Sequence, residues 1–444
     1  MLSRARQKTG YKIGIERETL RCQEDGRLAL TPHPSVFGDK LDNQHITVDF
    51  SESQPEIITD PFSDVESCYE SLKELTKELI EGCRQVNEYI WPQSMPCILP
   101  ETDRIPIADY GERGLEQRAY REKLCQKYDK KMQMICGVHL NFSFSESFFD
   151  ELIAGTPDLP LFYSRQQFKD RIYMKVAENY LKYHWLIVYL TGATPVKLDS
   201  REQSRVQSCA VSFRNSPSGY SNKSGVQVNF HSIEKYVSSI QQMIAEGLII
   251  SEKEVYAPVR LKRSDKTDAF EDLAKKGIDY IEIRSLDVNL FEPCGIDRET
   301  MYFMVNFLYF CALTEQHQDY ENILGDRQIA ANHTCGSLNE VWKETDEQNQ
   351  INEQNKSEEQ MVPLQGISDE LRARGLRVLN EMQQINQIYM ICPDMVRQEM
   401  KERLENYHRT PAYRTKELLL KEGYVKGSME QIKKRDMQLN KCRK

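Results

Sequence analysis

Acidic and other polar side chains recur on four segments of this sequence whose alternating polarity predicts β-strands. The segments are residues 11–21, 46–59, 132–144 and 278–288, and three of them supply carboxylates. Successive side chains of a strand point to opposite faces, so each segment has one apolar face and one polar face. Carboxylates are preferred ligands of hard cations such as Mg²⁺, which carries nucleotide phosphates through phosphoryl transfer. The pattern therefore predicts an acidic metal site in an ATP-using enzyme.

The first segment carries two glutamates on one face, opposite two isoleucines. Glu16 and Glu18 lie two residues apart, so both carboxylates can reach the same ions. Like charges this close repel one another unless a cation lies between them. The alternative is a solvated strand face on which Arg17 and Arg21 pair with the glutamates.

The second segment contains Asp49 and Glu56, which are seven residues apart and would face opposite sides of a regular strand. Both can face one site only across a bulge or a turn. Pro55 favours such an irregularity, because proline cannot donate to a strand ladder and is tolerated mainly at edges and bulges. An acidic edge loop is the alternative.

The third segment places His139 on the same polar face as Gln133, Asn141 and Ser143. A lone histidine can be a hydrogen-bonded structural group. Among carboxylates it can instead complete a metal site or donate to a phosphate. The segment alone leaves both interpretations open.

The fourth segment aligns Glu282 and Arg284, which offer an ion ligand beside a phosphate-binding guanidinium. An ordinary salt bridge is the alternative. Arg260, Lys262 and Arg263 form a further basic group that could hold anions or be solvated. No glycine-rich phosphate loop of the P-loop or dinucleotide-binding type occurs, so those nucleotide sites are disfavoured.

Composition limits the class of protein. The 444 residues have a net charge of −9, which argues against general binding to nucleic acid or to anionic membranes. Twelve cysteines without a Cys-x-x-Cys pair indicate reduced thiols. The N-terminus lacks the apolar core of a signal peptide, and no apolar run approaches the roughly 20 residues of a membrane helix. We therefore expect a cytoplasmic protein.

Helical periodicity follows the second segment, where Ser63 and Glu66 form a predicted capping box before an apolar stripe. Further helices are predicted over residues 165–190, 233–246, 298–314 and 369–387. The domain organisation predicted from these patterns is a catalytic domain over 1–330, a polar loop or linker over 331–360, and a C-terminal helical accessory region over 361–444.

Seven sequence blocks, read together, resemble glutamate–cysteine ligase (γ-glutamylcysteine synthetase) of the bacterial type, including the ligase half of bifunctional glutathione synthetases. Their order and spacing match over roughly residues 11 to 315. The blocks are GIERETLR from Gly14, TVDFSE from Thr47, WPQSMPC from Trp91, GVHLNFS from Gly137, GYSNKS from Gly219, YAPVR from Tyr256 and YIEIRSLD from Tyr280.

The resemblance implies an α+β fold, with a glutamine-synthetase-like antiparallel sheet curved into a funnel and surrounded by helices. It implies that ATP phosphorylates the γ-carboxylate of glutamate and that the amine of cysteine then displaces phosphate, the first step of glutathione biosynthesis. Two or three Mg²⁺ ions, with Mn²⁺ as a possible substitute, would assist. The implied partners are these small molecules, with no nucleic acid or membrane, in a monomer or small homo-oligomer.

The resemblance also implies roles for individual residues. The metal ligands would be Glu16, Glu18, Asp49, Glu56, His139 and Glu282. Arg284 and Arg121 would hold the transferring phosphoryl group, and Arg214 the α-carboxylate of glutamate. The cysteine pocket would comprise Phe50, Tyr120, Leu124, Gln133, Tyr220 and Tyr256.

Three positions depart from the family pattern: Pro55, Gln93 and Cys136 stand where an apolar residue, a leucine and a serine are expected. No ligand is lost, but Pro55 leaves the placing of Glu56 open. The resemblance fades after about residue 330, so we expect the reaction to stop at γ-glutamylcysteine. Two alternatives are a ligase of the same fold that uses another amine, because acceptor choice depends on few pocket residues, and a catalytically silent regulator that binds metal or amino acids.

Overall fold

The computed structural model describes residues 10–155, 164–198, 206–208, 211–216, 219, 222, 225–265, 270–314 and 367–441. The predicted linker and Tyr220 lie outside the described residues. Within these segments, no helix combines the length and the apolar character needed to cross a membrane, and the cysteines form no disulfide.

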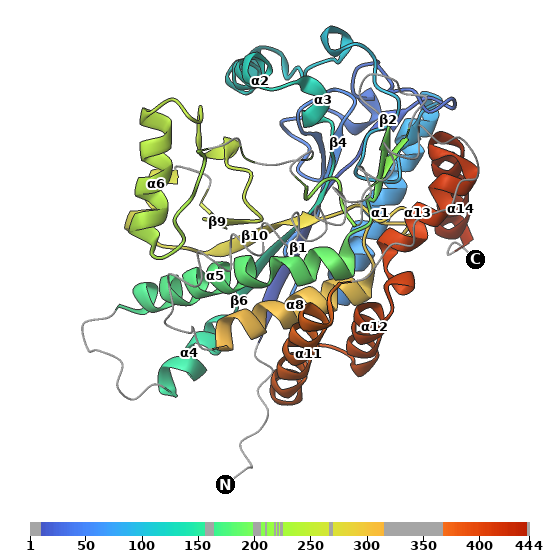
Figure 1. The fold of residues 1–444 in the computed structure, drawn as a ribbon. Helices are drawn as coiled ribbons and strands as arrows, with labels where there is room; N and C mark the ends of the chain where they lie inside the picture. The colour runs from blue at the N-terminus through green and yellow to red at the C-terminus, as the bar shows by residue number, and fades with distance from the viewer. Residues whose placement is uncertain are drawn as a thin grey trace, which may run out of the picture.

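A six-stranded sheet forms the centre of the molecule, and all of its pairings are antiparallel. Its spatial order brings the four predicted strand segments next to one another, although they are far apart in sequence (Figure 1). This confirms the predicted α+β class with an antiparallel sheet. In spatial order the strands are β3 (Ile46–Val48), β4 (Pro55–Ile58), β1 (Tyr11–Glu18), β6 (Val138–Phe144), β10 (Tyr280–Leu286) and β9 (Val259–Lys262).

Helices cover the apolar face of this sheet. Ile13 and Ile15 of β1 and Leu140 and Phe142 of β6 are fully buried there, which confirms the predicted alternation. Figure 1 shows α5 and α8 running side by side across the sheet. The covering helices are α1 (Val65–Gln85), α5 (Arg165–Thr191) and α8 (Arg298–Leu313).

The first two C-terminal helices pack against α8, and the last two lie at one end of the layer, in contact with α5 and α1 (Figure 1). Their buried side chains join the same hydrophobic core as the sheet. Because one core is continuous across these parts, the C-terminal helices support the layer that holds the sheet. They are α11 (Asp369–Tyr389), α12 (Asp394–Glu405), α13 (Pro411–Glu422) and α14 (Tyr424–Lys441).

Smaller elements surround the rim of the sheet, and α2 stands well away from the helical layer (Figure 1). They include β2 (Arg21–Cys22), β5 (Tyr89–Ile90), α2 (Leu115–Lys127), α3 (Lys130–Gln133), α4 (Glu146–Ala154), β7 (Val196–Leu198), β8 (Val206–Ser208), α6 (Ile233–Ala245) and α7 (Leu273–Lys276).

Several boundaries predicted from the sequence are wrong. The segment 132–144 is not one strand, because residues up to Gln133 form the short helix α3 and β6 begins at Val138. Gln133 therefore does not share a strand face with His139. The helix after the second segment is capped by Asp64, whose side chain accepts a hydrogen bond from Ser67 N at 2.8 Å, rather than by the predicted box.

Candidate active site

The polar faces of four neighbouring strands meet on the side of the sheet opposite the helical layer. The strand register sets Glu16 of β1 directly opposite His139 of β6. It also sets Glu18 opposite Glu56 of β4, and Asn141 of β6 opposite Glu282 of β10. Side chains directly opposite on one face lie about 4.5–5.5 Å apart at Cβ. The pairing therefore concentrates carboxylates in one place.

His139 lies at the centre of this group. Its Nδ1 is 3.5 Å from Glu16 Oε2 and 3.4 Å from Glu282 Oε1, while its Nε2 is 3.6 Å from Glu18 Oε1. The ring is buried, and its Nε2 has no hydrogen-bond partner among the described residues. The structure therefore brings together the histidine and three glutamates that the sequence analysis selected.

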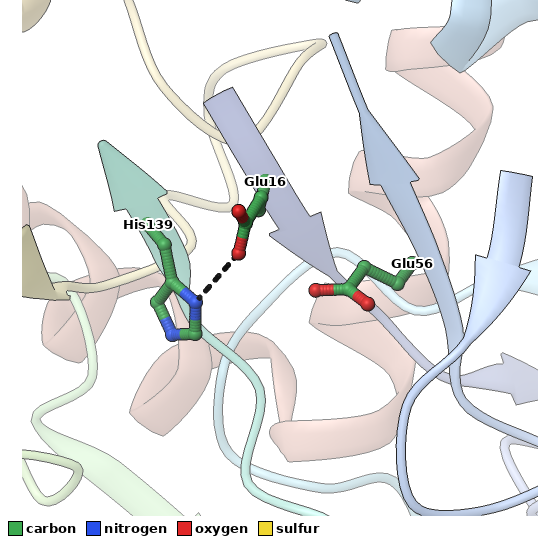
Figure 2. Close-up of side chains that lie close together, drawn as sticks. All are labelled: Glu16, Glu56 and His139. Atoms are coloured by element: carbon green, nitrogen blue, oxygen red, sulfur yellow. Dashed lines mark ion pairs between the residues drawn. The ribbon is translucent and has the colours of Figure 1, made fainter. Parts of the chain in front are cut away.

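Glu16, Glu56 and His139 could hold a metal ion. One ligand atom from each lies within 4.8 Å of the others, and Figure 2 shows both carboxylates and the imidazole gathered around a common space. The two carboxylates suit a divalent cation of the Mg²⁺ or Mn²⁺ type, and the imidazole nitrogen, a poor principal ligand for Mg²⁺, can complete such a carboxylate site. Asn141 holds Glu16 in place, because its Nδ2 donates to Glu16 Oε1 at 2.7 Å.

The chain turns between Asp49 and Glu56, which would face opposite sides of a regular strand. Residues 46–58 form a hairpin in which β3 pairs antiparallel with β4, and Asp49 N donates to Gln54 O at 3.0 Å. The predicted turn between Asp49 and Glu56 is therefore confirmed, and residues 46–59 do not form one continuous strand. Pro55 starts β4, so Glu56 keeps its place in the ladder opposite Glu18.

The solvated-face alternative for Glu16 and Glu18 is wrong. Glu18 is buried, and its Oε2 accepts a hydrogen bond from Gly137 N at 2.7 Å. Arg17 is buried on the opposite face of β1, and Arg21 forms its salt bridge with Glu88. Neither arginine neutralises the two glutamates.

The carboxylates perturb one another strongly. Burial raises the pKa of Glu56 well above its usual value, and the charges of Glu16, Asp49 and Glu18 raise it further. Burial also raises the pKa of Glu18. The described side chains do not offset the negative charge around Glu18 and Glu56, and a bound dication would offset it.

Basic side chains border the acidic group on the β10 side. Arg284 pairs with Glu282, and Arg260 of β9 lies opposite Glu282 with its Nη1 4.0 Å from Glu282 Oε2. Burial opposes ionisation of Glu282, but Arg284 and Arg260 outweigh burial and lower the pKa of Glu282 far below its usual range. Arg260, for which the sequence left two interpretations open, therefore lies beside the carboxylates.

Arg121 reaches the hairpin from α2. Its Nε donates to the carbonyl of Asp49 at 2.7 Å and its Nη2 to the hydroxyl of Tyr110 at 2.9 Å. The guanidinium therefore fixes the backbone at Asp49 in this structure.

Arg214 is buried beside the chain that leads into β6. A Cβ on Gly137 would lie 2.1 Å from its Nη2, so only a glycine lets the guanidinium pack this closely. Among the described residues, its Nε has no hydrogen-bond partner. A buried cation of this kind is suited to an anion supplied by a ligand.

Asp287 is a buried residue to which the sequence analysis assigned no role. Its carboxylate accepts hydrogen bonds from Ala193 N at 2.9 Å, Thr194 Oγ1 at 2.7 Å, Ser212 Oγ at 3.1 Å and Asn215 Nδ2 at 3.2 Å. These hydrogen bonds therefore connect the segment around Arg214 to the end of β10. In the sequence, Asp287 is the last residue of the YIEIRSLD block, and this position was the one signal that it belongs to the site.

Four of the residues proposed for a cysteine pocket lie near one another. Gln133 Nε2 donates to the hydroxyl of Tyr256 at 3.3 Å, and Tyr120 is close enough to Tyr256 to influence its pKa, which burial raises to about 12. Leu124 lies one turn after Tyr120 on α2 and is buried. Phe50 is buried and belongs to the main hydrophobic core.

Comparison with known proteins gives the family. The sequence profile of glutamate-cysteine ligase matches residues 2–334, so the chain belongs to the glutamate-cysteine ligase family. It is 38% identical over 447 residues to a glutathione biosynthesis bifunctional protein of Listeria monocytogenes, with 95% of this chain and 54% of the relative covered. The chain thus spans about half the length of this relative.

Two further comparisons cover most of both proteins. The chain is 34% identical over 456 residues to a glutamate–cysteine ligase of Clostridium acetobutylicum, with 90% of each covered. A crystal structure of glutamate–cysteine ligase from Francisella tularensis in complex with AMP superposes with a TM-score of 0.80 at 24% identity, covering 98% of this chain and 89% of that one. This structural similarity supports the fold described above.

Proposed function

We propose that this protein is an ATP- and Mg²⁺-dependent ligase that joins the γ-carboxyl of L-glutamate to the amine of L-cysteine. The product is γ-glutamylcysteine, the first intermediate of glutathione biosynthesis. The observation that carries the proposal is the meeting of Glu16, Glu56 and His139 from three strands within 4.8 Å, in a member of the glutamate-cysteine ligase family.

The acidic group would bind two or three divalent cations. Glu16, Glu56 and His139 provide one set of donors, and we propose that Glu18, Asp49 and Glu282 complete the remaining ligands. The raised pKa of Glu56 supports this role, because the neighbouring carboxylates that raise it need a counter-charge. Bound Mg²⁺ would neutralise phosphate oxygens of ATP during transfer. The use of ATP is supported by the structure of the Francisella tularensis protein, which was solved in complex with AMP.

Fixed positive charge would assist the transfer of the phosphoryl group. An oxygen of the glutamate γ-carboxylate attacks the γ-phosphorus of ATP, and ADP leaves. Arg284, at the border of the acidic group, would hold the transferring group, where preorganised charge lowers the barrier. We propose that Arg121 helps, and this requires its guanidinium to exchange its contact with the Asp49 carbonyl or with Tyr110 for the phosphoryl group.

The second step forms the amide. The amine nitrogen of cysteine attacks the acyl carbon of γ-glutamyl phosphate, and phosphate leaves. Arg214 would hold the α-carboxylate of glutamate, which its burial and unpaired Nε among the described residues support. Phe50, Tyr120, Leu124, Gln133, Tyr220 and Tyr256 would form the pocket for cysteine. Most of the rate enhancement would come from holding ATP, glutamate and cysteine in the geometry that the two steps require.

The test is to measure ADP formation with glutamate, Mg²⁺ and one amine at a time, comparing cysteine with 2-aminobutyrate and serine. The proposal predicts the highest kcat/KM with cysteine and equal amounts of ADP, phosphate and γ-glutamylcysteine. A higher kcat/KM with another amine would favour a ligase with a different acceptor. No ADP formation with any amine, together with tight Mg²⁺ binding, would favour a silent regulator.

A further inference from the structure

Glu254 is a buried carboxylate at the junction of two segments that contribute to the proposed cysteine pocket. It is 1% exposed, and it precedes Tyr256 by two residues. Its oxygens accept hydrogen bonds from the hydroxyl of Tyr128 and, at 2.6 Å, from Ile250 N, and they form an ion pair with Lys127. Glu254 therefore connects its own loop to the end of α2.

The helix α2 carries Tyr120 and Leu124 but has few apolar contacts that could hold it. Of its 13 residues, all within the described part of the chain, Leu124 alone is buried. The position of α2 therefore depends on polar contacts, which Arg121 makes with the β3–β4 hairpin and Lys127 makes with Glu254 at the C-terminal end of the helix. Hydrogen bonds to a charged acceptor are the stronger kind, especially where water is excluded.

The same contacts reach Tyr256 directly. The rings of Tyr128 and Tyr256 meet edge to face, with centroids 5.8 Å apart and an interplanar angle of 77°. The amide of Tyr256 donates to Asn222 Oδ1 at 2.7 Å, and its hydroxyl accepts from Gln133 at 3.3 Å. Tyr128 thus links the carboxylate of Glu254 to a side chain of the proposed pocket.

We propose that Glu254 is a positioning residue that sets the specificity and affinity of the pocket for the amine acceptor. By holding Tyr128 and Lys127, it fixes α2 against the Tyr256 loop and sets the separation of the pocket walls. This inference depends on the proposed function, because the pocket is defined by that function. Glu254 lies outside the acidic group and away from Arg214, so the KM for glutamate should not depend on it, whereas the KM for the acceptor should.

The test uses Glu254→Gln, which keeps the shape of the side chain and removes its charge. Loss of the charged acceptor leaves the Lys127 and Tyr128 donors poorly paired. We expect the KM for cysteine to rise about tenfold, with the KM for glutamate within about twofold of that of the unchanged protein. Tyr128→Phe should give a smaller rise. The matched control is Glu252→Gln. Glu252 makes no side-chain hydrogen bond among the described residues and acts on Tyr120 only through its charge, so this change should alter the KM for cysteine much less than Glu254→Gln does.

A second measurement does not require turnover. Hydrogen–deuterium exchange of residues 115–127 should be faster in Glu254→Gln than in the unchanged protein or in Glu252→Gln. Unchanged exchange, an unchanged KM for cysteine, or an equal rise in the KM for both amino acids would each overturn the inference. Absence of turnover with cysteine in the unchanged protein would instead refute the proposed function, and the exchange experiment would still decide the role of Glu254.

Discussion

Replacing Glu282 by glutamine is the most informative perturbation of the proposed site. The amide keeps the size of the side chain but removes its charge, and it presents an N–H group where the carboxylate presents only acceptors. Glu282 is 3% exposed and lies 3.4 Å from His139 Nδ1. We expect turnover to fall severely while the fold persists.

The magnitude follows from the surroundings of Glu282. At the 4.0 Å that separates it from Arg260, two unit charges attract by about 4 kcal/mol at an effective dielectric constant of 20. Repulsion from Glu56 and Glu16 cancels part of this attraction. Arg284 lies closer to Glu282 than Arg260 does and adds to the attraction. We therefore expect the free energy of unfolding to fall by at most about 3–5 kcal/mol, which an ordinary domain can tolerate. Loss of charge stabilisation at the reacting centre should lower kcat by about 10²–10³-fold.

The assay compares glutamate- and cysteine-dependent ADP release with thermal denaturation of the same samples. Glu24→Gln is the matched control, because it makes the same chemical change at an exposed position and should leave both measurements unchanged. Near-normal turnover in Glu282→Gln would refute the assignment of Glu282 as a ligand. A collapse of the fold would show that its main role is structural.

Three further predictions address the amino-acid pockets and the loop between β10 and α8. Tyr256→Phe should raise the KM for cysteine several-fold and leave the KM for glutamate nearly unchanged, as measured by steady-state kinetics; the reverse pattern would contradict the pocket assignment. Arg214→Met should raise the KM for glutamate by about 10²-fold, because a charged hydrogen-bonding partner is lost; an effect confined to cysteine would refute this. Burial, with the charges of Asp297 and Glu299, raises the pKa of Glu292 from 4.5 to about 7, so its ionisation destabilises the folded state progressively as the pH rises from 4.5 through 7. Glu292→Gln should therefore increase Tm more at pH 8 than at pH 5, and the two gains in the free energy of unfolding should differ by about 1–3 kcal/mol. An equal change at both pH values would show that the pKa of Glu292 is normal.

Much of the fold could be predicted because side-chain alternation is a local signal. The glutamates of β1, His139 of β6 and Glu282 of β10 each follow a period of two, and antiparallel pairing brings them together. Helical periodicity was equally informative for α5 and α11. These patterns need no knowledge of distant parts of the chain.

The errors arose where the chain turns. The hairpin between β3 and β4 and the short helix before β6 break the periodicity, and a few residues of turn carry too weak a signal to locate. The roles of Asp287 and Glu254 depend on partners distant in sequence. Buried polar contacts of this kind have no local pattern, so only the structure reveals them.

The most direct test of the central claim is anomalous diffraction from crystals soaked with Mn²⁺, a nonhydrolysable ATP analogue and glutamate. The account predicts Mn²⁺ peaks bound by Glu16, Glu56 and His139, with further ions at Glu18, Asp49 and Glu282 next to the nucleotide phosphates. Mn²⁺ and nucleotide bound elsewhere, with these side chains uncoordinated, would contradict it.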